Sequence, residues 1–89
     1  MIYGKLGNDY YNLGDFKKAI HYHERHLEIA RKVGDVSSEG VAYGNLGNDY
    51  HNLGDFKKAI HYHERHLEIA RKVENVSSEG TAYGNLGNA

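Results

Sequence analysis

The chain has 89 residues, of which 39% are hydrophobic and 26% charged, and its formal net charge is −1 with neutral histidines. A chain of this length forms one small domain. Because it has no cysteine, disulfides, thiolate metal sites and cysteine nucleophiles are excluded. The balanced charge argues against nucleic acid and anionic membranes as partners. The sequence opens without a leader-like segment and lacks a membrane-spanning apolar run, so we expect a cytoplasmic protein.

The sequence repeats itself with a period of 40 residues. Residues 3–42 and 43–82 differ at only five positions, and a third copy begins at Tyr83. Identity this high indicates either recent duplication or deliberate consensus design of the protein. We therefore expect a single array in which repeat 1 covers about residues 1–40, repeat 2 about 41–80, and the first helix of a partial third repeat about 81–89.

Each repeat is predicted to form two helices. In repeat 2, apolar residues recur at helical spacing between Val41 and Leu53, which predicts the first helix. Gly54 and Asp55 then separate the helices, because glycine takes the left-handed conformation at a helix C-terminus and aspartate caps the next N-terminus. A second apolar stripe predicts the second helix over Phe56–Val73. We find no segment that reads as a strand, so the predicted fold is all-α.

A short polar connector is predicted between the second helix of one repeat and the first helix of the next. In repeat 2 this connector covers residues 74–78. Serine is a favoured capping residue, because its side-chain oxygen accepts a hydrogen bond from a free backbone N–H. We therefore predict that Ser77 or Ser78, and in repeat 1 Ser37 or Ser38, cap the following helix.

The run from Asn45 to Ile60 resembles a tetratricopeptide repeat (TPR). The resemblance covers the whole chain, and the 40-residue period and Leu-Gly-Asn run are most similar to Pins-type G-protein-signalling modulators. It implies helix-turn-helix repeats stacked as a short right-handed α-solenoid. Two features depart from the family pattern: the closing Pro is missing, and Asp9 and Asp49 stand where a small residue is typical. The signature positions are occupied by Tyr43 in place of the usual Trp, Leu46, Gly47, Tyr50, Gly54 and Ala59.

Polar residues, most of them asparagines, lie at helical spacing along each predicted first helix, opposite its apolar stripe. In TPR proteins the first helices line a concave groove, so the resemblance places these residues inside it. An asparagine amide both donates and accepts hydrogen bonds, so it can clamp the main chain of an extended peptide. The alternative is that these residues only solubilise an exposed face. The candidate groove residues are Lys5, Asn8 and Asn12 in repeat 1, Asn45, Asn48 and Asn52 in repeat 2, and Asn85 and Asn88 in the third copy.

Three histidines recur in the second helix of each repeat. His21 and His23 point about 160° apart on a helix, so the three cannot hold one ion together. His63 falls on the apolar stripe, and we expect His23 and His63 to be buried, with pKa values below about 6.5. A metal site that joins two helices or two chains is the less favoured alternative. Its candidate ligands are His23, His26, His63 and His66, with Glu24 or Glu64 as a further ligand.

Nothing in the sequence predicts an enzyme or a cofactor. The Gly4-x-x-Gly7 and Gly44-x-x-Gly47 patterns lie in predicted helices and do not follow strands, so they are not phosphate loops. No pair of carboxylates stands out as acid and base. The resemblance therefore implies a non-enzymatic interaction scaffold that binds a peptide or protein in its concave groove. Two alternatives remain open: an engineered or excised scaffold that chiefly self-associates, and a metal-assisted oligomer through the repeated histidines.

The two ends of the array also predict self-association. A single helical hairpin cannot bury its own apolar stripe, so each repeat needs a neighbour. Because the repeats are almost identical, one end of a chain is an acceptable neighbour for the end of another. We therefore predict a homo-oligomer. A dimer, either stacked end to end or formed by exchange of the terminal segment, is favoured over an open filament.

Overall fold

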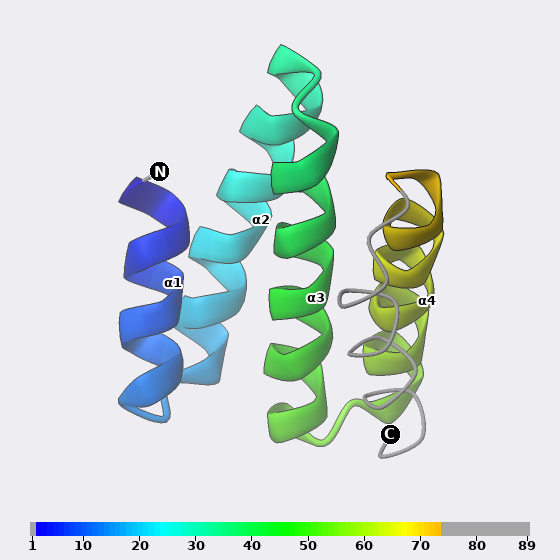
Figure 1. Ribbon diagram of the computed structural model, residues 1–89. Coiled ribbons are helices and arrows are strands. Elements are labelled where there is room, and N and C mark those ends of the chain that lie inside the picture. Colours follow the sequence, from blue (N-terminus) through cyan, green and yellow to red (C-terminus); the bar gives the residue numbers. More distant parts are fainter. Residues whose placement is uncertain (1, 74–89) are drawn as a thin grey trace.

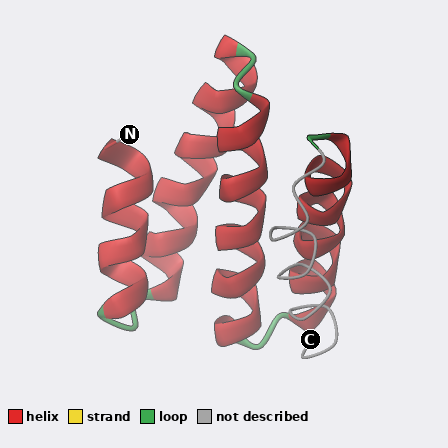
Figure 2. Cartoon of the chain, viewed as in Figure 1, coloured by secondary structure: helices red, strands yellow, loops and turns green. Residues whose placement is uncertain are grey.

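The computed structural model describes residues 2–73 as a row of helices that lie side by side and run alternately up and down (Figure 1). No strand is present in this part of the chain, which confirms the all-α prediction (Figure 2). The predicted third-repeat helix at about 81–89 lies outside the described residues, as do Ser77 and Ser78. The helices are α1 (Ile2–Asn12), α2 (Phe16–Val33), α3 (Val36–Leu53) and α4 (Phe56–Lys72).

The predicted turn between two helices is confirmed in repeat 2. Gly54 has a φ of 91°, the left-handed conformation that favours glycine, and it ends α3. Asp55 follows it and caps α4, because its side chain accepts a hydrogen bond from the backbone N–H of Lys58 at 3.2 Å. The same glycine-aspartate pair joins α1 to α2 in repeat 1, so this turn follows directly from local sequence.

The connector between the repeats differs from the prediction. The first helix of repeat 2 begins at Val36, five residues before Val41. The predicted capping role of Ser37 or Ser38 is wrong, because both lie inside α3 and the cap is Asp35. The Asp35 carboxylate accepts the backbone N–H of Ser38 at 3.1 Å and its hydroxyl at 2.8 Å. The Asp35 carboxylate lies just before the serines and accepts a hydrogen bond from a free N–H of the first helical turn. The helix therefore begins directly after Asp35 and includes both serines.

The buried core lies mainly between the two repeats, where α2 packs on α3. Tyr50 and Tyr62 stack against each other within repeat 2 at a ring-centroid distance of 5.5 Å, and both rings cover the core from its side. No helix within residues 2–73 is long and apolar enough to cross a membrane. The core cluster consists of Ile20 and Leu27 from α2 and Ala42, Tyr43 and Leu46 from α3.

Each hairpin closes where a glycine of its first helix meets a histidine of its second. His23 packs over Gly7, and His63 packs over Gly47. A Cβ atom at either glycine would overlap the imidazole ring, so only glycine permits this approach. His23 and His63 are each 1% exposed, which confirms that both histidines are buried as predicted.

Candidate functional site

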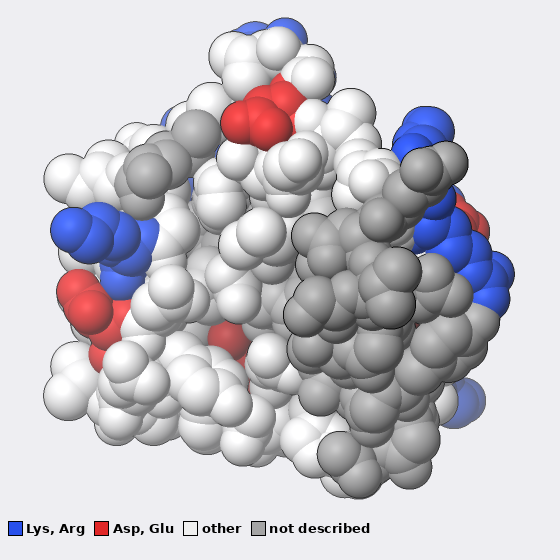
Figure 3. Space-filling view, viewed as in Figure 1, with Lys and Arg blue, Asp and Glu red and all other residues white. Residues whose placement is uncertain are grey.

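A polar pocket of about 280 Å³ lies between α1 and α3, the first helices of the two repeats. The face over these helices is mostly uncharged, with Lys and Arg side chains gathered toward its edges (Figure 3). Four of the predicted groove residues line this pocket together: Asn8 and Asn12 from α1, and Asn45 and Asn48 from α3. The remaining lining residues are Tyr11, His23 and Asp49.

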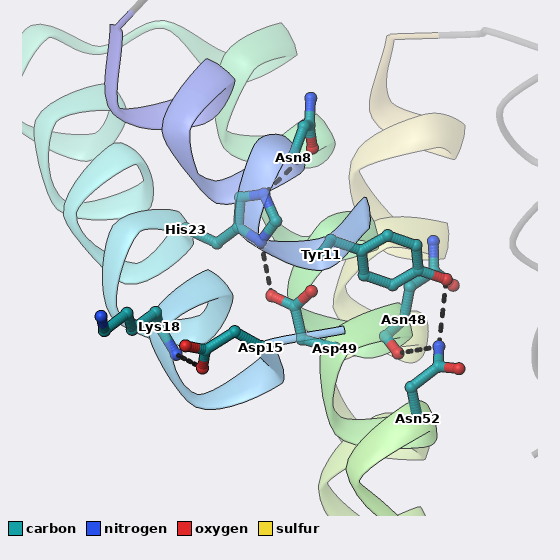
Figure 4. A network of polar contacts seen from close by, with 8 residues as sticks. All are labelled: Asn8, Tyr11, Asp15, Lys18, His23, Asn48, Asp49 and Asn52. Carbon is teal, nitrogen blue, oxygen red and sulfur yellow. Dashed lines mark hydrogen bonds and ion pairs between the residues drawn. The ribbon is translucent and has the colours of Figure 1, made fainter. Parts of the chain in front are cut away.

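Two further predicted groove residues, Lys5 and Asn52, are described by the structure and do not line the pocket. Lys5 is exposed on α1 and does not line the pocket. Asn52 lies beside it, where its amide nitrogen donates to the Tyr11 hydroxyl at 3.0 Å and to the backbone carbonyl of Asn48 at 2.8 Å (Figure 4). Asn52 therefore ties α1 to α3 at the edge of the pocket. Asn85 and Asn88 lie outside the described residues.

A buried histidine and a buried aspartate form the polar floor of the pocket. The Nδ1 of His23 lies 2.5 Å from Oδ2 of Asp49, and its Nε2 lies 3.1 Å from Oδ1 of Asn8 (Figure 4). Asp49 is 0% exposed, and this burial raises the pKa of its carboxyl, while the hydrogen bond to His23 acts in the opposite direction. The pair links α2 of repeat 1 to α3 of repeat 2.

Sequence reasoning did not find this pair. Asp49 stood out only as a departure from the family pattern, although His23 was predicted to be buried. The sequence feature that could have indicated the pair is an ionisable residue at a buried position on each of two successive helices, His23 on α2 and Asp49 on α3. An aspartate is almost never buried without a partner, so an aspartate on one helix and a buried histidine on the facing helix indicate a pair.

The second repeat contains the same histidine without the aspartate. His63 packs over Gly47, but its Nδ1 has no hydrogen-bond partner in the described part of the chain. Burial, with smaller contributions from His66 and His51, lowers the pKa of His63 to about 4, as the sequence predicted. The Nδ1 edge of His63 faces Gly47, whereas the Nε2 edge of His23 faces Gly7. The Asp49 carboxylate thus determines which way the His23 ring is turned.

The remaining predicted metal ligands are also packed against glycines. His26 lies against Gly4 and His66 against Gly44, and burial lowers the pKa of both imidazoles. Among residues 2–73, no three histidine, aspartate or glutamate side chains come together to hold a metal ion. The structure therefore places His26 and His66 in packing positions.

A larger hollow of about 540 Å³ lies on α2 and α4, the second helices. Glu24 and Glu28 line it together with Arg31 and Lys32, so charges of both signs surround the opening. Its apolar wall includes Leu27, a member of the core between repeats. This hollow has no concentration of one charge that would indicate a ligand class.

The geometry agrees with a comparison to known protein families. A family model described as tetratricopeptide repeat matches residues 1–72 and 38–89. These two matches overlap and together extend over the whole chain, and the helix pairs of the structure correspond to the hairpins of such repeats. The chain belongs to the tetratricopeptide repeat family.

Proposed function

We propose that the chain is a scaffold that binds an extended peptide segment of another protein in the pocket between α1 and α3. Tetratricopeptide repeats are generally protein-interaction scaffolds, and this proposal assigns the contact to particular residues. The observation that carries it is the convergence of Asn8, Asn12, Asn45 and Asn48 on one pocket.

The hydrogen-bonding groups of this pocket are suited to a peptide main chain. The side chains of Asn12, Asn45 and Asn48 make no hydrogen bond within the described residues, so their donors and acceptors remain available. A main chain offers both N–H and C=O groups, which an amide can pair with regardless of the peptide's side chains. Recognition of this kind favours an extended segment, because an extended main chain exposes these groups.

We propose binding rather than catalysis at this pocket. A histidine-aspartate pair supplies two of the three members of a hydrolytic triad, but the second nitrogen of His23 faces the amide oxygen of Asn8, which is not a nucleophile. The hydroxyl of Tyr11 accepts a hydrogen bond from Asn52 and is not activated by a base. The His23–Asp49 pair is thus better explained as a support for Asn8 and for the packing of the repeats.

The proposal is tested with a peptide selected on the wild-type chain from a random display library. Asn48→Ala should weaken binding of that peptide about fivefold, because one hydrogen bond contributes about 1 kcal/mol. The control is Lys5→Ala on α1, outside the pocket, which should leave the affinity unchanged. Both variants should melt like the wild type, since neither side chain is buried. If Asn48→Ala and Asn12→Ala both bind the peptide as tightly as the wild type, the proposal that this pocket binds the peptide is wrong.

We also propose that the chain self-associates. The observation that favours this second function is the mismatch between the two ends of the row. Asp9 on α1 is exposed, whereas Asp49, its equivalent in repeat 2, is buried and paired. His63 on α4 is buried without the partner that its equivalent His23 has. Metal-assisted assembly through the histidines gains no support from residues 2–73.

A further inference from the structure

The Asp49 carboxylate has one oxygen that the described part of the chain does not use. Its Oδ2 lies 2.5 Å from Nδ1 of His23, whereas its Oδ1 is buried and has no hydrogen-bond partner within residues 2–73. A buried polar atom without a partner is destabilising, and a carboxylate accepts hydrogen bonds at both of its oxygens. The free oxygen therefore calls for a donor that residues 2–73 do not supply.

The free oxygen faces the pocket between α1 and α3. In Figure 4 it points away from His23, toward the side on which Tyr11 and Asn48 lie, and both of these residues line the pocket. Figure 3 shows a small acidic area deep in the hollow between α1 and α3. Among the described lining residues the acidic one is Asp49. The free oxygen thus lies at the floor of the pocket.

The charge of this floor favours a cationic ligand group. Burial raises the pKa of Asp49, but the hydrogen bond from His23 lowers it and so favours the ionised carboxylate. No Lys or Arg is among the lining residues that the structure describes, and such side chains gather toward the edges of this face (Figure 3). Hydrogen bonds between charged groups are roughly twice as strong as neutral ones, so a positively charged donor is the best match.

The geometry favours an ammonium over a guanidinium. A guanidinium binds a carboxylate through two parallel hydrogen bonds, one to each oxygen. That arrangement is not open to a ligand here, because Oδ2 of Asp49 already pairs with His23. An ammonium is a compact charge with three donors, so one of them can meet Oδ1 of Asp49. The others can meet the amide oxygens of Asn45 and Asn48, which also line the pocket.

The size and walls of the pocket suit a single side chain. Its volume of about 280 Å³ lies below the range of about 300–1,000 Å³ that is typical of pockets for whole small molecules. Tyr11 provides an apolar wall along which the methylene groups of a lysine can lie while its ammonium reaches the floor. Asn12 is exposed, and exposed side chains change rotamer within nanoseconds, so it can move aside to admit the lysine.

We propose that the pocket between α1 and α3 receives a lysine side chain of the bound peptide, whose ammonium donates a hydrogen bond to Oδ1 of Asp49. This inference rests on the proposed peptide binding and names the side chain that the peptide presents. A peptide N-terminus also carries an ammonium and shares this chemistry. The lysine is the better match, because an extended segment that continues in both directions along the groove presents side chains rather than its terminus.

An NMR titration of the isotope-labelled chain tests the site. The probe is capped lysine, which is acetylated at its amine and methylamidated at its carboxyl group, and it should shift the side-chain amide signals of Asn45 and Asn48. Capped norleucine has the same four side-chain carbons without the ammonium. It should bind about tenfold more weakly, because a charged hydrogen bond is lost. Capped arginine and norleucine amide, whose α-amine is free, should also bind more weakly than capped lysine.

Two matched variants assign the preference for lysine to one carboxylate. Asp49→Asn keeps the shape of the side chain and should abolish the preference for capped lysine over capped norleucine. Asp9→Asn removes the same charge from the same repeat position, but Asp9 is exposed and does not line the pocket, so the preference should remain. Circular dichroism checks that both variants fold. If Asp49→Asn does not fold, the comparison of probes on the wild-type chain still decides the proposal.

Three results of the titration would overturn the lysine site. Unshifted asparagine signals, or equal affinity for capped lysine and capped norleucine, would mean that no ammonium binds there. Tighter binding of norleucine amide than of capped lysine would reassign the pocket to a peptide N-terminus. Loss of the preference in Asp9→Asn as well as in Asp49→Asn would reveal a general charge effect rather than a contact with Asp49.

The peptide selected from the display library separates this inference from the proposed peptide binding. Replacing one of its lysines by norleucine should weaken binding about tenfold, and the same replacement should have no effect on binding to Asp49→Asn. A peptide that depends on Asn12 and Asn48 but on no lysine would overturn the lysine site and leave the peptide groove intact. A peptide that depends on neither asparagine would overturn the groove, and the capped-lysine titration then decides the lysine site by itself.

Discussion

Replacing Asp49 tests whether the buried pair stabilises the contact between the repeats. Its carboxylate is 0% exposed and accepts from His23 at 2.5 Å, and the ring of His23 is itself 1% exposed. Asp49→Ala would leave a buried imidazole without its acceptor. Removing one member of such a pair costs about 3–5 kcal/mol of unfolding free energy. Asp49→Asn keeps an oxygen at the same place and should cost only about 1–2 kcal/mol.

Urea unfolding followed by circular dichroism measures both losses. The measurement belongs at low micromolar concentration, where contacts between copies do not contribute. Asp9→Ala is the matched control, because Asp9 occupies the same repeat position as Asp49 but is exposed on α1. Its effect should stay within about 0.5 kcal/mol. If Asp49→Ala fails to fold, the Asp49→Asn value still gives the contribution of the carboxylate relative to a neutral amide of the same shape.

The three variants should differ in stability in a fixed order. Asp49→Ala should be the least stable, Asp49→Asn intermediate, and Asp9→Ala close to the wild type. Equal stability of the Asp49→Ala and Asp9→Ala variants would refute the view that the buried pair holds the repeats together. A stable Asp49→Ala variant would also mean that the His23 imidazole finds water or another acceptor when its partner is removed.

Further predictions concern two glycines and the buried His63. Gly47→Ala places a methyl group against the His63 ring and should cost about 1–3 kcal/mol in urea unfolding. Gly34→Ala, at a φ of 71°, should cost about 1 kcal/mol by the same measurement, because alanine is strained in the left-handed region. Acid should also destabilise the fold. The pKa of His63 is about 4 in the folded chain, whereas an unperturbed histidine, as in the unfolded chain, has a pKa of 6.5. The unfolded state then binds more protons between these values, so the His63 contribution, about 3 kcal/mol, is fully present above pH 6.5 and lost toward pH 4. The melting temperature should fall as the pH is lowered over this range. His63→Phe should make the melting temperature depend less on pH. An equal pH dependence in the wild type and in His63→Phe would contradict the assignment of the effect to His63.

Features that depend on neighbouring residues could be predicted well from the sequence. The helical spacing of Tyr43, Leu46 and Tyr50 predicted a helix that α3 contains, and Gly54 with Asp55 predicted its end. The start of α3 could not be predicted as reliably. Both Asp35 and the serines after it are good caps, so local preference alone does not select one of them. The structure selects Asp35, whose carboxylate bonds to Ser38.

The candidate site was predictable only in part. The spacing of Asn45 and Asn48 placed them on one polar face of a helix, and both do line the pocket. Lys5 has the same helical spacing in repeat 1, but it does not line the pocket. A helical stripe winds along its helix, so only the portion opposite a neighbouring helix can contribute to a shared pocket.

By itself, the sequence determined the repeat, the helices and the turns, because each depends on residues within a few positions of one another. It also determined that His23 and His63 are buried, since both fall on an apolar stripe. Only the tertiary structure decided that Asp49 meets His23, 26 residues away, and that Asn8 shares a pocket with Asn48. Such contacts depend on how far one helix is shifted along the next. That shift is set by side-chain packing across the whole interface, which no single stripe of residues specifies.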